Sequence, residues 1–146
     1  MRVDFYITED ASPAARLRLA CRLAEKAYTA GHRVFVSGTD DVELAQLDEL
    51  LWTFADGSFI PHTLVQDGEA AQTAEEPVVL GRRAPADAPL EIVLNLSSEI
   101  PDFASRAQRV IEVIDGDAAR RAAGRVRFKA YREMGCELST YELQKS

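Results

Sequence analysis

Short apolar segments alternate with amphipathic segments along most of this 146-residue chain, and this alternation restricts the possible folds more than any other feature. The clearest apolar segment is LEIVLNL at 90–96, which has the length and composition of a buried strand. Further strands are predicted at 3–8, 33–37 and 109–114, with a brief one at 78–80. Strands separated by helices in this way favour βαβ units and a mainly parallel sheet.

Cap residues and apolar spacing predict helices between these strands. The first covers about 12–30, with a serine N-cap, a proline at the first helical position and a glycine after its end. The second starts at Thr39 or Asp40, and Glu43 is placed to complete a capping box with Asp40. A third, longer helix is predicted over 117–134.

The expected fold class is α/β: a three-layer, Rossmann-like sandwich with a mainly parallel sheet and no nucleotide-binding loop, formed by one domain over residues 1–146. Residues 53–65 are predicted to begin as a loop and close with a short strand. Residues 66–90 are mostly loop, and 101–107 form a turn or a short helix. No element is predicted for the tail that starts at Cys136.

The segments after the predicted strands lack the residues that nucleotide chemistry requires. Sheets of this kind often bind nucleotides at the carboxyl ends of their strands, where glycines let backbone N–H groups approach phosphate. Neither GxGxxG nor the GxxxxGK motif with a following serine or threonine occurs. The segments TEDASP and SGTDD, after the first two strands, each carry two carboxylates that repel phosphate. We therefore expect no cofactor and no catalytic activity.

The two histidines and two cysteines form no catalytic or metal-binding pattern. His32 and His62 have no neighbouring nucleophile motif, and we interpret both as surface or loop histidines. Cys21 and Cys136 lie far apart in the sequence, so we expect reduced thiols and no structural metal. The absence of a signal-peptide pattern and of a long apolar run predicts a cytoplasmic protein without membrane association.

Charge is distributed unevenly along the chain. The formal net charge is -7, which disfavours non-specific DNA binding by the whole molecule. Between Asp117 and Arg132, however, there are six basic residues and one acidic residue. A single basic helix in an acidic protein indicates a local anionic ligand.

This basic helix is expected to have two distinct sides at about 100° per residue. The side expected to face the sheet carries Ala119, Ala123, Val126, Ala130 and Met134. The opposite side carries Arg121, Arg125 and Arg132, flanked by Lys129 and Phe128. Guanidinium groups on successive turns, about 5–6 Å apart, match a carboxylate or an acidic peptide. The alternative is a helix face that is simply exposed to solvent. The excess of positive charge disfavours this alternative, because neighbouring arginines repel each other unless an anion pairs with them.

Aromatic and apolar residues gather between the second helix and the next strand. They are Trp52, Phe54, Phe59, Ile60 and Pro61. One interpretation is a plug at the edge of the core. The other is an exposed patch that forms a protein interface, in which aromatic residues supply most of the binding energy.

Two longer segments carry a family resemblance: RVFVSGTDDVELAQLDELLWTFADGSFIPHTLV at 33–65 and RVRFKAYREMGCEL at 125–138. The most specific pieces are the helix end LDELLW, the loop SFIPH and the helix RxRFKAYR with its following glycine. In these pieces the chain resembles the chi subunit of bacterial DNA polymerase III. The resemblance covers most of the chain, is weak over 66–90, and implies an accessory subunit of the clamp loader without a nucleotide site.

The resemblance also implies a peptide partner, the acidic C-terminal tail of single-stranded DNA-binding protein, which ends in a phenylalanine with a free carboxylate. Arg125 would hold the carboxylate, Arg121 would meet the upstream acidic residues, and Ile114 would wall the phenylalanine pocket. The full set implied for the tail is Ile114, Arg121, Arg125, Phe128, Lys129 and Arg132.

A second partner is implied at the aromatic segment. Trp52, Phe59 and Pro61 match the region through which family members bind the psi subunit, the link to the clamp loader. Another protein, such as a repair helicase, is the alternative partner at this surface. DNA would then be contacted only indirectly.

Two other functions remain as alternatives. A direct single-stranded nucleic-acid binder would use the same basic helix, but the net charge and the few aromatic residues on that helix disfavour it. A nucleotide-dependent enzyme would need the phosphate-binding loop that the sequence lacks.

Overall fold

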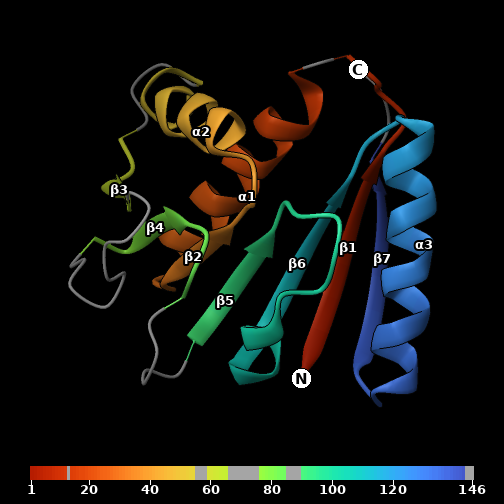
Figure 1. Ribbon diagram of the computed structural model, residues 1–146. Coiled ribbons are helices and arrows are strands. Elements are labelled where there is room, and N and C mark those ends of the chain that lie inside the picture. Colours follow the sequence, from red (N-terminus) through yellow and green to blue (C-terminus); the bar gives the residue numbers. More distant parts are fainter. Residues whose placement is uncertain (13, 55–58, 66–75, 85–89, 144–146) are drawn as a thin grey trace.

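The computed structural model describes residues 1–12, 14–54, 59–65, 76–84 and 90–143. Within these ranges the protein is an α/β fold with one open, all-parallel sheet of seven strands, in the order β3-β4-β2-β5-β6-β1-β7 (Figure 1). The strands are β1 Arg2–Thr8, β2 Val34–Ser37, β3 His62–Leu64, β4 Val78–Gly81, β5 Leu90–Asn95, β6 Ala107–Ile114 and β7 Glu137–Leu143. The helices are α1 Ala15–Thr29, α2 Asp41–Thr53, α3 Ala118–Glu133 and a short 3-10 helix at Asp102–Arg106.

Helices cover both faces of the sheet, which makes the predicted three layers. One core packs α1 and α2 against one face of the central strands, and it contains Val36, Leu94 and Ile111. The other core packs α3 and the 3-10 helix against the opposite face, and it includes Val93 and Val110. Because side chains alternate along a strand, neighbours such as Val93 and Leu94 belong to different cores. Figure 1 shows α2 near the β3 end of the sheet and α3 along the β7 end.

The connections explain the strand order. The chain leaves β1 through α1 and returns as β2, on the other side of β6 and β5. It leaves β6 through α3 and returns as β7, on the far side of β1. The two crossovers therefore start from the adjacent strands β1 and β6 and pass each other in opposite directions, and α1 and α3 lie on opposite faces of the sheet.

The helix ends agree with the sequence in most places. α1 ends before Gly31, whose φ of +89° favours glycine, and α3 ends before Gly135 with φ +83°. Asp40 caps α2 by accepting hydrogen bonds from the backbone N–H groups of Val42 and Glu43. Asp117 caps α3 through the N–H of Arg120.

Two predicted caps are wrong. Ser12 is not the N-cap of α1, because the helix begins three residues later and its N-cap, Ala14, makes no side-chain hydrogen bond. The proline of that prediction lies outside the described residues. Glu43 does not complete a capping box either, since its carboxylate forms a bidentate ion pair with Arg16 of α1. That ion pair joins α1 to α2.

The strands predicted from apolar runs are all present, and the brief strand at 78–80 is β4. Most of the predicted loop at 66–90 lies outside the described residues. The strand that the sequence did not predict is β7, which pairs with β1 along its whole length. Among the described residues, no helix combines the length and apolar character needed to cross a lipid bilayer.

Candidate functional site

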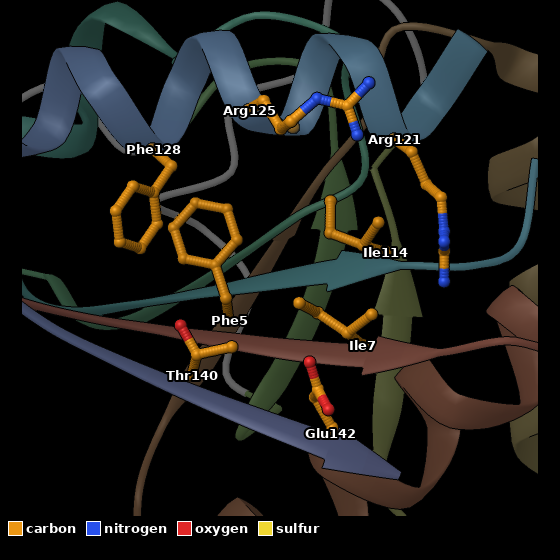
Figure 2. Close-up of a pocket in the computed structure, with 9 residues that line it drawn as sticks. Phe5, Ile7, Ile114, Arg121, Arg125, Phe128, Thr140 and Glu142 are labelled. Atoms are coloured by element: carbon orange, nitrogen blue, oxygen red, sulfur yellow. The ribbon is translucent and has the colours of Figure 1, made fainter. Parts of the chain in front are cut away.

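A hollow of about 220 Å³ lies between α3 and the strands β6, β1 and β7 (Figure 2). It is lined by Phe5, Ile7, Ile114, Arg121, Gly124, Arg125, Phe128, Thr140 and Glu142. The sequence predicted four of these residues, Ile114, Arg121, Arg125 and Phe128, as parts of one site. The structure brings those four together.

Strand register builds the floor of this hollow. Ile7 of β1 pairs with Ile114 of β6 on one side and with Glu142 of β7 on the other. One row further along, Phe5 pairs with Thr140. The floor is therefore apolar under β6 and β1, and it becomes polar at β7.

The wall of the hollow is formed by α3. Gly124 has no side chain above Ile114, and a Cβ at this position would lie 2.7 Å from Ile114 Cδ1. This glycine keeps the space open. Phe128 closes one end by an edge-to-face contact with Phe5, with ring centroids 5.3 Å apart.

The two arginines at the hollow are available to a ligand. Arg121 donates from Nε to the backbone oxygen of Asp115 at 3.2 Å, and Arg125 is exposed. Within the described part of the chain, neither guanidinium forms an ion pair. Figure 2 shows the Arg121 side chain extending from α3 to the level of Ile114 and Ile7, and the Arg125 side chain running along α3 above Ile114. Two unneutralised cations beside an apolar hollow are suited to an apolar group that carries a carboxylate.

Two other arginines of α3 are neutralised by the protein itself. Arg120 forms a bidentate pair with Asp115, at 2.9 Å and 2.7 Å. Arg127 is buried and donates from Nε to Glu112 at 3.1 Å. Both arginines line a second hollow of about 260 Å³ above the carboxyl ends of β5 and β6, together with Arg16. Because Arg16 is also paired, this second hollow offers no unneutralised guanidinium to an anion.

The buried Glu112 is held by a small polar network. Its carboxylate accepts hydrogen bonds from Arg127, from Asn95 at 3.0 Å and from the Tyr131 hydroxyl at 2.7 Å. Burial raises the pKa of Glu112, against the opposing effect of these donors. The network ties α3 to β5 and β6 directly behind the candidate site.

The predicted sheet-facing side of α3 is wrong. Val126 and Met134 are 69% and 52% exposed, and Ala119 is exposed too. The buried residues are instead Gly124, Arg127 and Tyr131. The helix is rotated because the strand beneath it presents the carboxylate of Glu112, which a paired arginine must reach.

This rotation also changes the position of the cationic side. Arg121 and Arg125 do not point away from the sheet but lie at its margin, over the hollow. Lys129 and Arg132 are exposed on α3 and are not among the residues that line the hollow. They extend the positive charge along the helix rather than shape the site.

The aromatic segment is divided between the two interpretations: Ile60 is buried in the core and Phe54 packs against it, whereas Trp52 and Phe59 form an exposed patch. Trp52 is 48% exposed and Phe59 is 65% exposed, with ring centroids 5.3 Å apart. Pro61 is partly exposed between the buried residues Ile60 and His62. The side chains of Trp52 and Phe59 are therefore exposed at the surface near β3, as the interpretation of an exposed patch predicted.

The prediction for His62 as a surface or loop histidine is wrong, because it lies in β3 with a buried ring. Its Nδ1 is 2.6 Å from the Ile60 carbonyl oxygen, and its Nε2 is 3.0 Å from that of Asp48. The ring contacts Trp52 at a centroid distance of 4.2 Å and so supports the aromatic patch. His32 is exposed as predicted and lies beside Glu91.

The cysteines are free, as the sequence predicted. Cys21 is buried in α1, and burial raises the pKa of its thiol to about 12, so it is a poor nucleophile. Cys136 is partly buried next to the core beneath α3. In the described ranges, no group of three or more histidine, cysteine or acidic residues is arranged to hold a metal ion.

The sequence did not predict five residues of the site. Phe5 and Ile7 read only as parts of a strand, and Thr140 and Glu142 lie in the unpredicted β7. Gly124 lies within the predicted helix, where it was not predicted to have a role in the site. Its occurrence in the middle of an alanine-rich helix was the available signal, because glycine there is unfavourable unless space requires it.

Comparison with known proteins identifies the family. The sequence model of the family described as DNA polymerase III chi subunit, HolC, matches residues 1–139. The chain belongs to the DNA polymerase III chi subunit family. Members of this family are accessory subunits of DNA replication.

Three relatives named DNA polymerase III subunit chi show how far the similarity extends. The protein from Pseudomonas aeruginosa is 41% identical over 142 residues, covering 97% of this chain and 96% of the relative. That from Haemophilus influenzae is 33% identical over 139 residues, covering 94% of each chain. That from Escherichia coli is 28% identical over 123 residues, covering 84% of this chain and 82% of the relative. The family match over residues 1–139 therefore includes the site residues from Phe5 to Phe128, and it ends before Thr140 and Glu142.

Proposed function

We propose that the chain is a non-catalytic replication adaptor, which binds the acidic C-terminal tail of single-stranded DNA-binding protein and links it to the clamp loader of DNA polymerase III. Its place of action is the cytoplasm, at the replisome. The observation that carries the proposal is the pair of unneutralised arginines, Arg121 and Arg125, at the mouth of an apolar hollow. Family membership supports it, because the matched relatives are named as subunits of that polymerase.

The hollow fits the end of such a tail. A phenylalanine ring would enter between Ile7, Ile114 and Phe128, where the walls are apolar. Its terminal carboxylate would lie at the guanidinium of Arg125, which can hold both oxygens. Arg121 would contact acidic residues that precede the phenylalanine.

The remaining cations of α3 act at longer range. Lys129 and Arg132 are exposed and do not line the hollow, so each contributes less than Arg125. Their main effect is to attract an acidic peptide and to make its binding sensitive to salt.

The clamp-loader side of the adaptor is the aromatic patch. Trp52 and Phe59 are exposed and in contact with each other, and Pro61 adjoins them. Large exposed aromatics of this kind supply binding energy when they enter a partner's pocket. The psi subunit is the proposed partner, and another replication or repair protein is the alternative.

Isothermal titration of the full chain with the tail peptide of the same organism's single-stranded DNA-binding protein tests the proposal. We expect micromolar binding that weakens with salt and is lost when the terminal carboxylate is amidated. Arg125→Ala should weaken binding by about 1.5–3 kcal/mol, the size of a hydrogen bond to a charged group.

Arg18→Ala is the matched control, because Arg18 is exposed on α1, on the other face of the sheet, and its loss changes the net charge equally. It should leave the affinity unchanged. Equal binding of the amidated and free peptides contradicts the proposal. Tight binding of bare single-stranded DNA with a steep salt dependence would favour the nucleic-acid alternative instead.

A further inference from the structure

The candidate site contains one carboxylate, on the side opposite its cations. Glu142 lies in β7 and lines the same hollow as Arg121 and Arg125. Figure 2 shows it on the strand side, beside Ile7 and across from α3. In the described residues it forms no ion pair with either arginine. A site for an anionic peptide therefore has a cationic wall and an anionic margin.

The anionic margin lies at the outer edge of the sheet. β7 is the last strand in the sheet order of the described residues, so its outer backbone groups are open to another strand. A peptide held in the hollow has two possible courses from there: along α3, or along β7 as an added strand. Carboxylates on an edge strand disfavour the second course for an acidic peptide, because like charges repel at this range.

We propose that Glu142 determines the course of the bound peptide by repelling its acidic residues from the β7 edge and so directing them along α3. This inference rests on the proposed function, since it assumes an acidic tail in the hollow. The favoured course runs along α3 from Arg125, which holds the terminal carboxylate, to Arg121, which contacts the upstream acidic residues. The site then selects a peptide that is acidic upstream and binds it in one direction only.

Glu142→Gln tests the inference, because it removes the charge and keeps the shape. Two peptides are compared by isothermal titration at low salt: the acidic tail, and the same tail with its upstream Asp and Glu residues replaced by Asn and Gln. We expect Glu142→Gln to bind the acidic tail about threefold tighter than the wild type, the effect of one charge at about 7 Å in a water-like medium. The gain should disappear with the neutralised peptide.

Glu137→Gln is the matched control. Glu137 is exposed at the other end of β7, and its odd spacing from Glu142 places it on the opposite face of the sheet. This variant should bind the acidic tail as the wild type does. The inference is overturned if Glu142→Gln shows no gain, or shows the same gain with both peptides.

The wild-type titrations distinguish failure of this inference from failure of the proposed function. If the wild type binds neither peptide, the adaptor proposal fails and the inference fails with it. If the wild type binds the acidic tail in a carboxylate-dependent manner but Glu142→Gln is equal to it, only the inference fails.

Discussion

Four of the five arginine residues in α3 occupy two environments that the helix sequence alone does not distinguish. Arg127 is buried against Glu112, and Arg120 is paired with Asp115. Arg121 and Arg125 face the hollow that Glu142 also lines, and neither forms an ion pair with any described residue. The first pair stabilises the position of the helix, whereas the second pair is free to bind a ligand.

The buried pair has a consequence for the site. Removing Arg127 would leave the Glu112 carboxylate buried without its cation, which usually costs several kcal/mol. Tyr131, which donates a hydrogen bond to the same Glu112 carboxylate, packs edge-to-face on Phe5 in the floor of the hollow. The network therefore fixes the distance between the helix and the floor, and substitutions at Arg127 would change both stability and binding.

Gly124→Ala is expected to weaken tail binding more than it weakens the fold. The new Cβ would lie 2.7 Å from Ile114 Cδ1, so Ile114 must move, and the hollow is the free space next to it. Overpacking of this kind costs about 1–3 kcal/mol, and the higher helix propensity of alanine returns about 1 kcal/mol. Titration with the tail peptide should show an affinity loss of about tenfold, or about 1.4 kcal/mol.

The double variant Gly124→Ala with Ile114→Val is the control, because valine has no Cδ1 and makes room for the new methyl group. It should recover most of the affinity, although Ile→Val itself costs about 0.5–1.5 kcal/mol of stability. Urea unfolding of all three proteins separates stability from binding. Unchanged tail affinity in Gly124→Ala would show that the space above Ile114 is not occupied by the peptide.

At the scale of elements, the sequence predicted α3 and its caps but not its orientation. An amphipathic pattern assigns apolar residues to the buried side, and here the buried side contains Arg127 and Tyr131. The reason for this arrangement, Glu112, lies in a strand that reads as ordinary alternation. Which arginine of α3 is buried becomes clear only when the helix is packed on β6, where Glu112 pairs with Arg127.

β7 was not predicted because its segment, ELSTYEL, has few apolar residues. An edge strand half open to water needs little apolar character, and its position is stabilised by pairing with β1. The sequence could therefore predict Arg121, Arg125 and Phe128 on the helix side of the candidate site, and the family resemblance added Ile114 of β6. It could not predict the strand side, which depends on the order of β6, β1 and β7.

The start of α3 is expected to lose stability in acid. Burial alone would raise the pKa of Asp115, but hydrogen bonds and charge from Arg120 outweigh it and hold the pKa below its ordinary value of 3.8. A lowered folded-state pKa gives stability that is fully present above pH 3.8 and is lost as the pH falls below it. Arg120→Met removes this contribution, at a cost of about 1–2 kcal/mol near neutral pH for a partly exposed pair.

Urea unfolding of the wild type and Arg120→Met between pH 7 and pH 3 measures the effect. The difference in unfolding free energy should be constant near neutral pH and should narrow as the pH falls below 3.8. Asp115 then binds a proton in the unfolded state, while Arg120 still favours its ionised form in the folded wild type. Arg132→Met serves as the comparison, since Arg132 is exposed at the far end of the same helix. A difference that stays constant down to pH 3 would mean that Asp115 does not depend on Arg120.

At the scale of the molecule, the two proposed surfaces lie at opposite ends of one sheet. Trp52 packs on His62 of β3, the first strand in the sheet order, and the hollow lies over β1 and β7 at the other end. Six strand spacings of about 4.8 Å separate these ends by about 30 Å. The alternation of strands and helices predicted the parallel sheet, but it did not predict this separation, because it does not specify strand order.

The separation predicts that the two surfaces bind independently. Their distance exceeds the Debye length of about 8 Å at physiological salt, and a rigid sheet lies between them. Trp52→Ala should therefore leave tail-peptide affinity within about 0.3–0.5 kcal/mol of the wild type, the limit for additive distant sites. The same variant should lose most of its binding to the clamp-loader complex, because a large exposed aromatic is removed from the proposed interface.

Arg125→Ala should show the converse behaviour, with clamp-loader binding retained and tail binding lost. Size-exclusion chromatography with the purified complex, and titration with the tail peptide, measure the two activities on the same preparations. The double variant should show the sum of the two single effects and no more. A coupling above about 0.5 kcal/mol would mean that the sheet transmits a change between its ends, and the adaptor would then be a regulated connection rather than a passive one.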